Sequence, residues 1–534
     1  MFSTTRAFAF RFATGAALAV ALALPVSAQV TAHKQAIAEM ASEDRDVAAF
    51  YRAQVYAPIW TGTGAAFEAR RMALFDALRG APAHGLAASR YDIDGLIAQM
   101  RAARSTRALG EIEVELSRAF LKYARDVQTG MLVPSSIDSG IVRTVPYRDR
   151  AALLTEFSRS DDPVAFMRAL PPQTHEYAAL RKEKLRLEAR IAQGGWGPTV
   201  PSGKLEPGDS GTRVIALRDR LQAMGYLGRS ATATYDKAME EAVRSFQMSH
   251  GLEVDGVAGD GTISELNVSP EARMRSILVA MERERWFNRE RGPRHVLVNL
   301  ADFHAKIIDD DRIVFQTRSV VGHRDSDRRS PEFSDVMEHM IINPSWNVPR
   351  SIITKEYLPV LQKNPNAVSH LLITDSRGRA VDRGAVDFTQ FSSRSFPFDM
   401  RQPPGPSNAM GLVKFMFPNK HNIYLHDTPQ KHLFSREVRA YSHGCIRLAD
   451  PFEFAYALLS EQTDDPVGLF HRTLDTGRET KVDLRDPLPV HLIYRTAISK
   501  PKGGMEYRRD VYGRDAKIWS ALEQAGVALN GIQG

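Results

Sequence analysis

Cysteine is almost absent from this chain of 534 residues, which contains one, Cys445. A disulfide bond within the chain is therefore excluded. Stability must come from buried apolar side chains, and hydrophobic residues make up 43% of the sequence. A chain of this length is expected to form several domains. An excess of one charge sign is also lacking, because the formal net charge is only +7. That excess is too small over this length to predict a nucleic-acid partner.

Long apolar runs are lacking beyond the N-terminus. The run at residues 13–24 is shorter than the roughly 18 residues that a membrane span needs. Arg6 and Arg11 precede this run and Val26-Ser27-Ala28 follows it, which is the pattern of a signal peptide comprising residues 1–28. The alternative is an uncleaved anchor. Removal of the signal takes away two arginines and leaves a formal charge of +5 on an exported chain with no stable membrane span.

Helical periodicity dominates residues 29–195, which we interpret as a helical scaffold domain. No catalytic constellation occurs in this region. A linker rich in glycine and proline, residues 194–208, separates it from the next unit. The clearest apolar stripe at helical spacing consists of Ile112, Leu116, Phe120 and Tyr123.

Residues 206–268 contain short helical stripes joined by glycine turns, which predicts a small three-helix domain. The pattern resembles the peptidoglycan-binding type 1 module over nearly its full length. This resemblance implies that the unit binds the cell wall, and the mild positive charge of the chain is compatible with such an acidic polymer. The segments that carry the resemblance are Leu221-Gln222, Gly225-Tyr226, Phe246-Gln247, Gly251-Leu252 and Asp255-Gly256-Val257.

From about residue 294 the apolar period changes to two, as in Val296, Val298 and Leu300, which predicts a mainly β domain over residues 293–480. Residues 351–408 interrupt it with a helical and then proline-rich stretch. This stretch is long for a plain loop, so we expect an inserted lid subdomain, the alternative being a mobile surface insertion. Residues 481–534 are expected to pack on the scaffold. The predicted fold class is multi-domain α+β.

Cys445 lies among residue types that make a thiol reactive. A thiol is mostly protonated at neutral pH and needs a base, and His426 lies nineteen residues upstream. On an alternating strand Tyr424 and His426 share one face, whereas the Asp427 side chain points the other way. Asp427 is therefore a poor third triad member through its carboxylate, but its backbone carbonyl could hold the imidazole tautomer.

The residues around Cys445 suggest how charge is stabilised during a reaction. Gly444 lets the turn expose the N–H groups of His443, Gly444 and Cys445, which could hold an oxyanion. Arg447 could bind a substrate carboxylate or support the loop. The segment reads Ser442-His443-Gly444-Cys445-Ile446-Arg447-Leu448.

His426, fifteen intervening residues and this segment resemble the L,D-transpeptidase signature. The resemblance spans residues 294–475 and implies a cysteine acyltransferase that forms 3→3 cross-links between peptidoglycan stem peptides. It implies that Cys445 is the nucleophile, that His426 is the base, and that a carbapenem acylates Cys445. It also implies a periplasmic or exported protein bound to the cell wall. The residues implied to build or support the site are Ser442, His443, Gly444, Arg447, Asp427, Tyr424 and Trp346; for Tyr424 and Trp346, plain aromatic packing is the alternative.

The sequence leaves other functions open. An L,D-carboxypeptidase or a wall-anchoring transferase would use the same residues with a different acceptor. A non-enzymatic wall-binding protein would need only the module at residues 206–268. A metal site built from His426, His443 and Cys445 lacks the usual ligand spacing. We therefore expect neither a metal nor a cofactor, and the sequence leaves the oligomeric state open.

Overall fold

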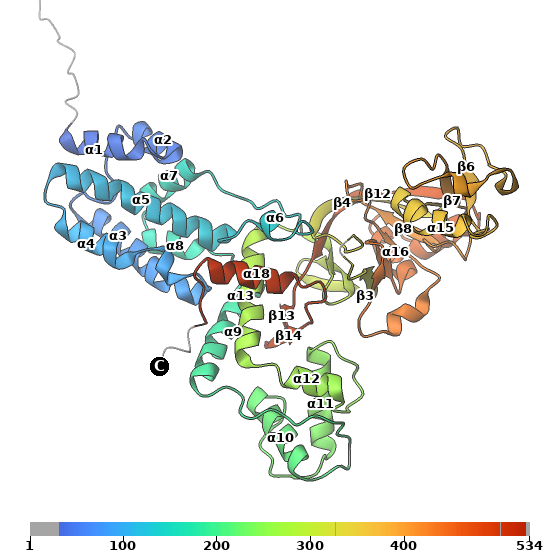
Figure 1. Cartoon of the computed structure of the whole chain (residues 1–534). Coiled ribbons are helices and arrows are strands. Elements are labelled where there is room, and N and C mark those ends of the chain that lie inside the picture. Colours follow the sequence, from blue (N-terminus) through green and yellow to red (C-terminus); the bar gives the residue numbers. More distant parts are fainter. Residues whose placement is uncertain (1–30, 326, 502, 530–534) are drawn as a thin grey trace, which may run out of the picture.

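The computed structural model describes residues 31–325, 327–501 and 503–529. The expected signal peptide lies outside these residues. Within them, none of the helices combines the length and the apolar composition needed to cross a membrane. Three parts surround the central helix α13, Pro270–Trp286: an elongated helical part, a small helical part and a large sheet (Figure 1).

The N-terminal part is helical. Its longest helix, α5, begins after Ser105, whose Oγ accepts a hydrogen bond from the N–H of Ala108 at 3.1 Å. Glu113 of α5 is fully buried and accepts hydrogen bonds from the N–H groups of Ile59 (2.5 Å) and Thr61 (2.8 Å), which ties the preceding loop to the helix. The helices are α1 Ala32–Ala41, α2 Arg45–Ala53, α3 Ala65–Gly80, α4 Ile93–Ala102, α5 Thr106–Thr129, α6 Pro134–Ile137, α7 Arg150–Arg159, α8 Pro163–Ala169 and α9 His175–Ala192.

The small helical part contains α10 (Thr212–Met224), α11 (Lys237–Ser249) and α12 (Asp260–Leu266). It has its own apolar core, which includes Leu217 and Phe246. Helix α10 is followed by Gly225, whose φ of +84° is the left-handed conformation that favours glycine.

One nine-stranded sheet forms the third part, in the order β10-β3-β11-β9-β8-β4-β12-β1-β2. β2 also pairs with β3, which closes the sheet on itself around an apolar core. Helices α16 (Pro451–Leu459) and α17 (Pro466–Leu474) contribute to the same core. The strands are β1 Arg294–Asn299, β2 His304–Asp309, β3 Arg312–Gly322, β4 Phe333–Ile342, β8 Val413–Met416, β9 Leu425–His426, β10 Ala440–Ser442, β11 Ile446–Leu448 and β12 Thr480–Ile493.

The position of β12 differs from our expectation that residues 481–534 pack on the scaffold. β12 lies inside the sheet, antiparallel to β4 and parallel to β1. Its parallel partner is almost two hundred residues away, as the pairing of Val296 with Val490 shows, and no local pattern in the sequence reveals such a pairing. The remaining elements, β13 (Ala497–Ser499), β14 (Met505–Tyr507) and α18 (Arg514–Gln524), add side chains to a core shared with α9 and α13.

The insertion between β4 and β8 is a folded unit. Its strands form a separate sheet in the order β5-β7-β6. Its apolar core includes Leu358, Phe388 and Met400, so burial of apolar side chains orders a segment that looks polar in sequence. The elements are β5 Trp346–Asn347, α14 Arg350–Ile352, a π-helical turn Ile353–Tyr357, α15 Leu358–Leu361, β6 Leu372–Thr374 and β7 Asp399–Gln402.

Candidate active site

The cysteine turn, residues 442–446, joins β10 to β11. The Ser442 hydroxyl donates to the backbone oxygen of Cys445 at 2.6 Å and accepts the N–H of Gly444 at 3.1 Å. Gly444 has a φ of +112°, which an L side chain rarely adopts. The Gly444 N–H is thus already engaged, which differs from our expectation that it helps to hold an oxyanion. The N–H groups of His443 and Cys445 remain as candidate donors.

The Cys445 thiol is partly exposed, and its sulfur contacts the loop that leads into β9. Sγ donates to the carbonyl oxygen of Asn422 at 3.5 Å. Desolvation by the surrounding protein atoms raises the pKa of Cys445 to about 11, although Tyr424 and Arg447 act to lower it. The thiol is therefore neutral at physiological pH in this conformation.

A side chain of the same loop fixes the contact between Asn422 and the sulfur. The Asn419 amide donates to the carbonyl oxygens of Phe417 at 2.6 Å and Ile423 at 2.7 Å, and its own oxygen accepts the N–H of Ile423 at 3.2 Å. Asn422 itself has a φ of +53°, a conformation that asparagine tolerates better than most residues. The loop therefore presents the Asn422 carbonyl in one orientation.

His426 is buried in the middle of the sheet, with only 2% of its surface exposed. Its Nδ1 lies 2.5 Å from the backbone oxygen of Asp427, so Nδ1 carries the proton and Nε2 keeps its lone pair. Burial, followed by the charge of Arg447, lowers the pKa of His426 to about 3. A neutral imidazole with a free Nε2 has the protonation state that a general base requires.

The Asp427 carboxylate points away from the imidazole. It accepts the N–H groups of Leu412 at 2.9 Å and Thr428 at 2.7 Å and pairs with Lys431 Nζ at 2.7 Å. It therefore supports the backbone around His426 and does not contact the ring, as strand alternation requires.

Strand register places Cys445 and His426 on one face of the sheet. β11 and β9 run parallel, with Ile446 opposite Leu425 and Arg447 opposite His426. Side chains two residues apart on a strand share a face. Cys445 directly precedes β11, two residues before Arg447, so continuation of this alternation puts it on the face of Arg447 and His426. The hydrogen bond recorded for the thiol goes to Asn422, and catalytic hydrogen bonds often form only once substrate is bound.

Two cations share this face, and our sequence analysis missed one of them. Lys414 of β8 pairs with His426 from the other side, and its Nζ lies 3.4 Å from the carbonyl oxygen of Ser345. Arg447 contacts the Gln430 side-chain oxygen at 2.5 Å, and its buried Nε has no hydrogen-bond partner among the described residues. The alternation of residues in β8 could have shown which face of its own strand Lys414 occupies. Only the pairing of β8 with β9 shows that His426 lies on the same face.

The remaining predicted residues lie around this centre. His443 is exposed, and its Nε2 is 2.6 Å from Oε1 of Glu356 in the insertion. His443 and Glu356 therefore link the cysteine turn to the inserted subdomain, a contact that the sequence did not indicate. Trp346 is buried in the core of the insertion. Tyr424 packs between this core and that of the sheet, and its ring centroid is 5.7 Å from that of His426.

A metal-ligand set does not form at this centre, because His443 is directed to Glu356 and His426 to Asp427. In the described ranges, no group of three or more His, Cys, Asp or Glu side chains is arranged to hold a metal ion.

Comparisons with known proteins assign a class to each part of the chain. Residues 293–478 match the family described as "L,D-transpeptidase catalytic domain", which indicates an acyltransferase-type domain around Cys445. Residues 210–266 match a family described as "Putative peptidoglycan binding domain", and residues 45–183 match one described as "Scaffold domain". Three regions of the chain are thus similar to an L,D-transpeptidase catalytic domain, a peptidoglycan-binding domain and a scaffold domain.

A Haemophilus influenzae protein described as "Putative L,D-transpeptidase" is 32% identical over 225 residues, covering 42% of this chain and 45% of that protein. The chain thus spans less than half the length of this curated relative. Among solved structures, an L,D-transpeptidase from Xylanimonas cellulosilytica is 14% identical, covers 55% of this chain and 98% of that chain, and has a TM-score of 0.18. One from Stackebrandtia nassauensis is 14% identical, covers 56% and 97%, and has a TM-score of 0.22.

Proposed function

We propose that this protein is an L,D-transpeptidase that forms 3→3 cross-links between peptidoglycan stem peptides through a thioester on Cys445. The observation that carries the proposal is the placement of Cys445, His426, Arg447 and Lys414 on one face of the sheet, inside the region that matches the catalytic domain. Attack on the peptide bond of an anionic stem peptide requires a thiol nucleophile, a neutral imidazole as base and cations that bind the peptide, and this face carries all of them.

In the first half of the reaction, Cys445 Sγ forms a bond to the carbonyl carbon of the third stem residue. The thiol proton passes to Nε2 of His426 and then to the leaving amine, so the bond to the terminal D-alanine breaks. In the second half, the amine of an acceptor stem attacks the thioester. His426 takes the amine proton, and the Cys445 thiol is released.

The cations around His426 make its basicity depend on whether a donor stem is bound. The charges of Arg447, Lys414 and Lys431 all act to lower the pKa of His426. A carboxylate of the donor stem that binds Lys414 and Arg447 would neutralise two of these charges. The pKa of the imidazole then rises towards its usual range, and His426 becomes a stronger base when the donor is in place.

The other parts of the chain bring the catalytic domain to its substrate. We infer that the domain at residues 210–266 holds the peptidoglycan, and that the chain works at the cell wall after export by the N-terminal signal. The insertion contacts the cysteine turn through Glu356 and His443, which supports a role as a lid that shapes the acceptor side of the site. Oxyanion stabilisation by the cysteine turn would also make Cys445 a target for acylation by a carbapenem.

Muropeptide analysis after incubation of the mature protein with tetrapeptide-rich sacculi tests this function. We expect new 3→3 cross-linked dimers together with released D-alanine. Tripeptides without new dimers would instead identify an L,D-carboxypeptidase, and attachment of a protein lysine would identify a wall-anchoring transferase. If the protein sediments with the sacculi but the muropeptides do not change, it is a non-enzymatic peptidoglycan-binding protein and the proposal is overturned.

Replacement of Lys414 by methionine should weaken donor binding more than it slows the chemical step. The substitution keeps the unbranched side chain and removes the charge, and a hydrogen bond to a charged group contributes about 1.5–3 kcal/mol. We therefore expect KM for an anionic tetrapeptide donor to rise by about tenfold or more, with a smaller change in kcat. Steady-state D-alanine release measures both.

Lys420→Met is the matched control, because Lys420 is exposed in the loop that follows β8. It should leave KM unchanged. Equal KM values for the Lys414→Met and wild-type enzymes would show that Lys414 does not bind the donor.

A further inference from the structure

The backbone carbonyl of Gly444 accepts a hydrogen bond from a buried serine that lies outside the segment of residues 442–448. Ser330 lies in the loop between β3 and β4 and is fully buried. Its hydroxyl donates to the Gly444 oxygen at 2.6 Å and accepts the N–H of Gly322 at 2.9 Å. Both hydrogen bonds end on backbone atoms, so the hydroxyl clamps the cysteine turn to the end of β3.

This clamp determines where the N–H of Cys445 points. A trans peptide bond is planar, and its C=O and N–H point in opposite directions. The carbonyl of Gly444 and the N–H of Cys445 belong to the same peptide. Because Ser330 holds the oxygen on the buried side, the N–H points to the opposite side, where the sulfur is partly exposed. No hydrogen bond from the Cys445 N–H is recorded among the described residues.

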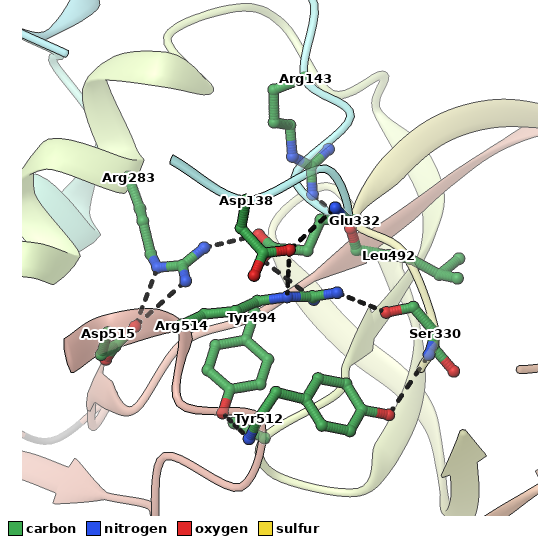
Figure 2. Close-up of polar contacts among 12 residues, drawn as sticks. Asp138, Arg143, Arg283, Ser330, Glu332, Leu492, Tyr494, Tyr512, Arg514 and Asp515 are labelled. Carbon is green, nitrogen blue, oxygen red and sulfur yellow. Dashed lines mark hydrogen bonds and ion pairs between the residues drawn. The ribbon is translucent and has the colours of Figure 1, made fainter. Parts of the chain in front are cut away.

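Two residues of the C-terminal segment hold Ser330 in turn (Figure 2). The Tyr512 hydroxyl donates to the Gly322 oxygen at 2.7 Å and accepts the N–H of Ser330 at 3.4 Å. Arg514 is fully buried and donates through Nη2 to the Ser330 carbonyl oxygen at 2.9 Å. The Tyr512 ring is stacked on that of Tyr494, with 5.6 Å between the centroids, which fixes the position of its hydroxyl.

Charged residues from three parts of the chain anchor Arg514. It pairs with Glu332 at 3.2 Å, and Glu332 also pairs with Arg283 of α13 at 2.6 Å (Figure 2). Two residues of the scaffold region also contact this group. The carbonyl oxygen of Gly140 accepts the N–H of Glu332 at 2.7 Å, and the Asp138 carboxylate lies 3.8 Å from Arg514. These ion pairs are buried, so loss of one partner would leave an uncompensated charge.

We propose that Ser330 is a positioning residue that aims the N–H of Cys445 at the oxyanion of the tetrahedral intermediate, and that Tyr512 holds Ser330 in that position. The inference rests on the proposed function, because an oxyanion forms only if Cys445 attacks a carbonyl. It gives the C-terminal segment a part in the chemistry, although β14 and α18 lie outside the sheet that carries Cys445 and His426.

Two reactions of the same sulfur separate positioning from plain structural support. Acylation by a tetrapeptide donor passes through an oxyanion and needs the N–H of Cys445. Alkylation by iodoacetamide forms the S–C bond while the C–I bond breaks and iodide leaves, so no oxyanion arises. Loss of one oxyanion donor costs about 10²–10³ in rate. For Ser330→Ala, which misdirects the donor without deleting it, we expect acylation to slow by about tenfold to a hundredfold, with alkylation at pH 9 unchanged.

Ser319→Ala is the matched control. Ser319 is also fully buried, near the end of β3, but its hydroxyl has no hydrogen-bond partner in the described part of the chain. Its replacement should change neither rate. Equal acylation rates for the Ser330→Ala and wild-type enzymes would overturn the inference, as would a parallel fall in acylation and alkylation.

Tyr512→Phe keeps the stacked ring and removes the hydroxyl from Gly322 and Ser330. It should slow acylation by about threefold to tenfold with alkylation unchanged. If Ser330→Ala does not fold, this variant tests the inference in its place: equal acylation rates for Tyr512→Phe and wild type, or a parallel fall in acylation and alkylation, would overturn it. A wild-type enzyme that is alkylated at Cys445 but never acylated by the donor would contradict the proposed function itself. The two failures are thereby distinguishable.

Discussion

A Cys445→Ser enzyme should release D-alanine from tetrapeptide stems at least about a thousandfold more slowly than the wild-type enzyme, because a nucleophile and its base act as a unit. The serine hydroxyl is much less acidic than a thiol, and His426, with its pKa lowered to about 3, is too weak a base to ionise it. The measurement is D-alanine release over time, combined with mass spectrometry of the intact protein. A donor or carbapenem adduct should appear on the wild-type chain and be missing from the variant.

The variant should otherwise behave as the wild type does. The domain matched at residues 210–266 lies apart from Cys445 in sequence and has its own core, so sedimentation with sacculi should be retained. An unchanged melting temperature would exclude a folding defect. D-alanine release at the wild-type rate from a folded Cys445→Ser enzyme would show that the reaction does not proceed through a thioester.

Local periodicity in the sequence accounts for much of the fold. The alternation of Val296, Val298 and Leu300 predicts a strand, and β1 occupies Arg294–Asn299. Alternation also predicts the face of Asp427 correctly, because the direction of a side chain depends on its own strand. The helical N-terminal region, whose predicted stripe includes Ile112 and Phe120, follows from the same kind of local pattern.

Long-range pairing accounts for what the sequence could not reveal. β12 looks like a strand in sequence, but its partners, β1 and β4, are brought to it only by the closed sheet. Lys414, Glu356 and Ser330 are ordinary residues of a strand, an insertion and a loop, and the folded chain places all three around Cys445 or the cysteine turn. Their parts in the proposed site depend on tertiary contacts that leave no periodic signal.

Burial keeps the Cys445 thiol and the His426 imidazole neutral. Desolvation raises the pKa of Cys445 to about 11 and lowers that of His426 to about 3, so no thiolate–imidazolium pair forms at neutral pH. The sulfur is thereby protected from unspecific electrophiles. In the proposed reaction, proton transfer must therefore accompany the attack on the donor carbonyl, which would link the base, the oxyanion donor and the donor-binding cations in one step.

The pH dependence of acylation should show this coupling directly in wild-type and His426→Ala enzymes. A base accepts protons only above its own pKa, and kcat/KM reports the groups of the free enzyme. With a pKa of about 3 for His426 and about 11 for Cys445, wild-type kcat/KM should be flat between about pH 5 and pH 9. A histidine with the usual pKa of about 6.5 would instead give a fall below that pH.

Without His426, only thiolate formed by loss of a proton to solvent can react. The His426→Ala enzyme should therefore be slower by orders of magnitude at neutral pH, and its kcat/KM should rise about tenfold for each pH unit, because the thiolate fraction rises in that way below the pKa of about 11. Acylation rates measured between about pH 5 and pH 9 give the kcat/KM profiles of both enzymes. His432→Ala is the control, since His432 is exposed a few residues beyond β9 and should keep the flat profile. A flat profile in the His426→Ala enzyme would mean that a group other than His426 takes the thiol proton.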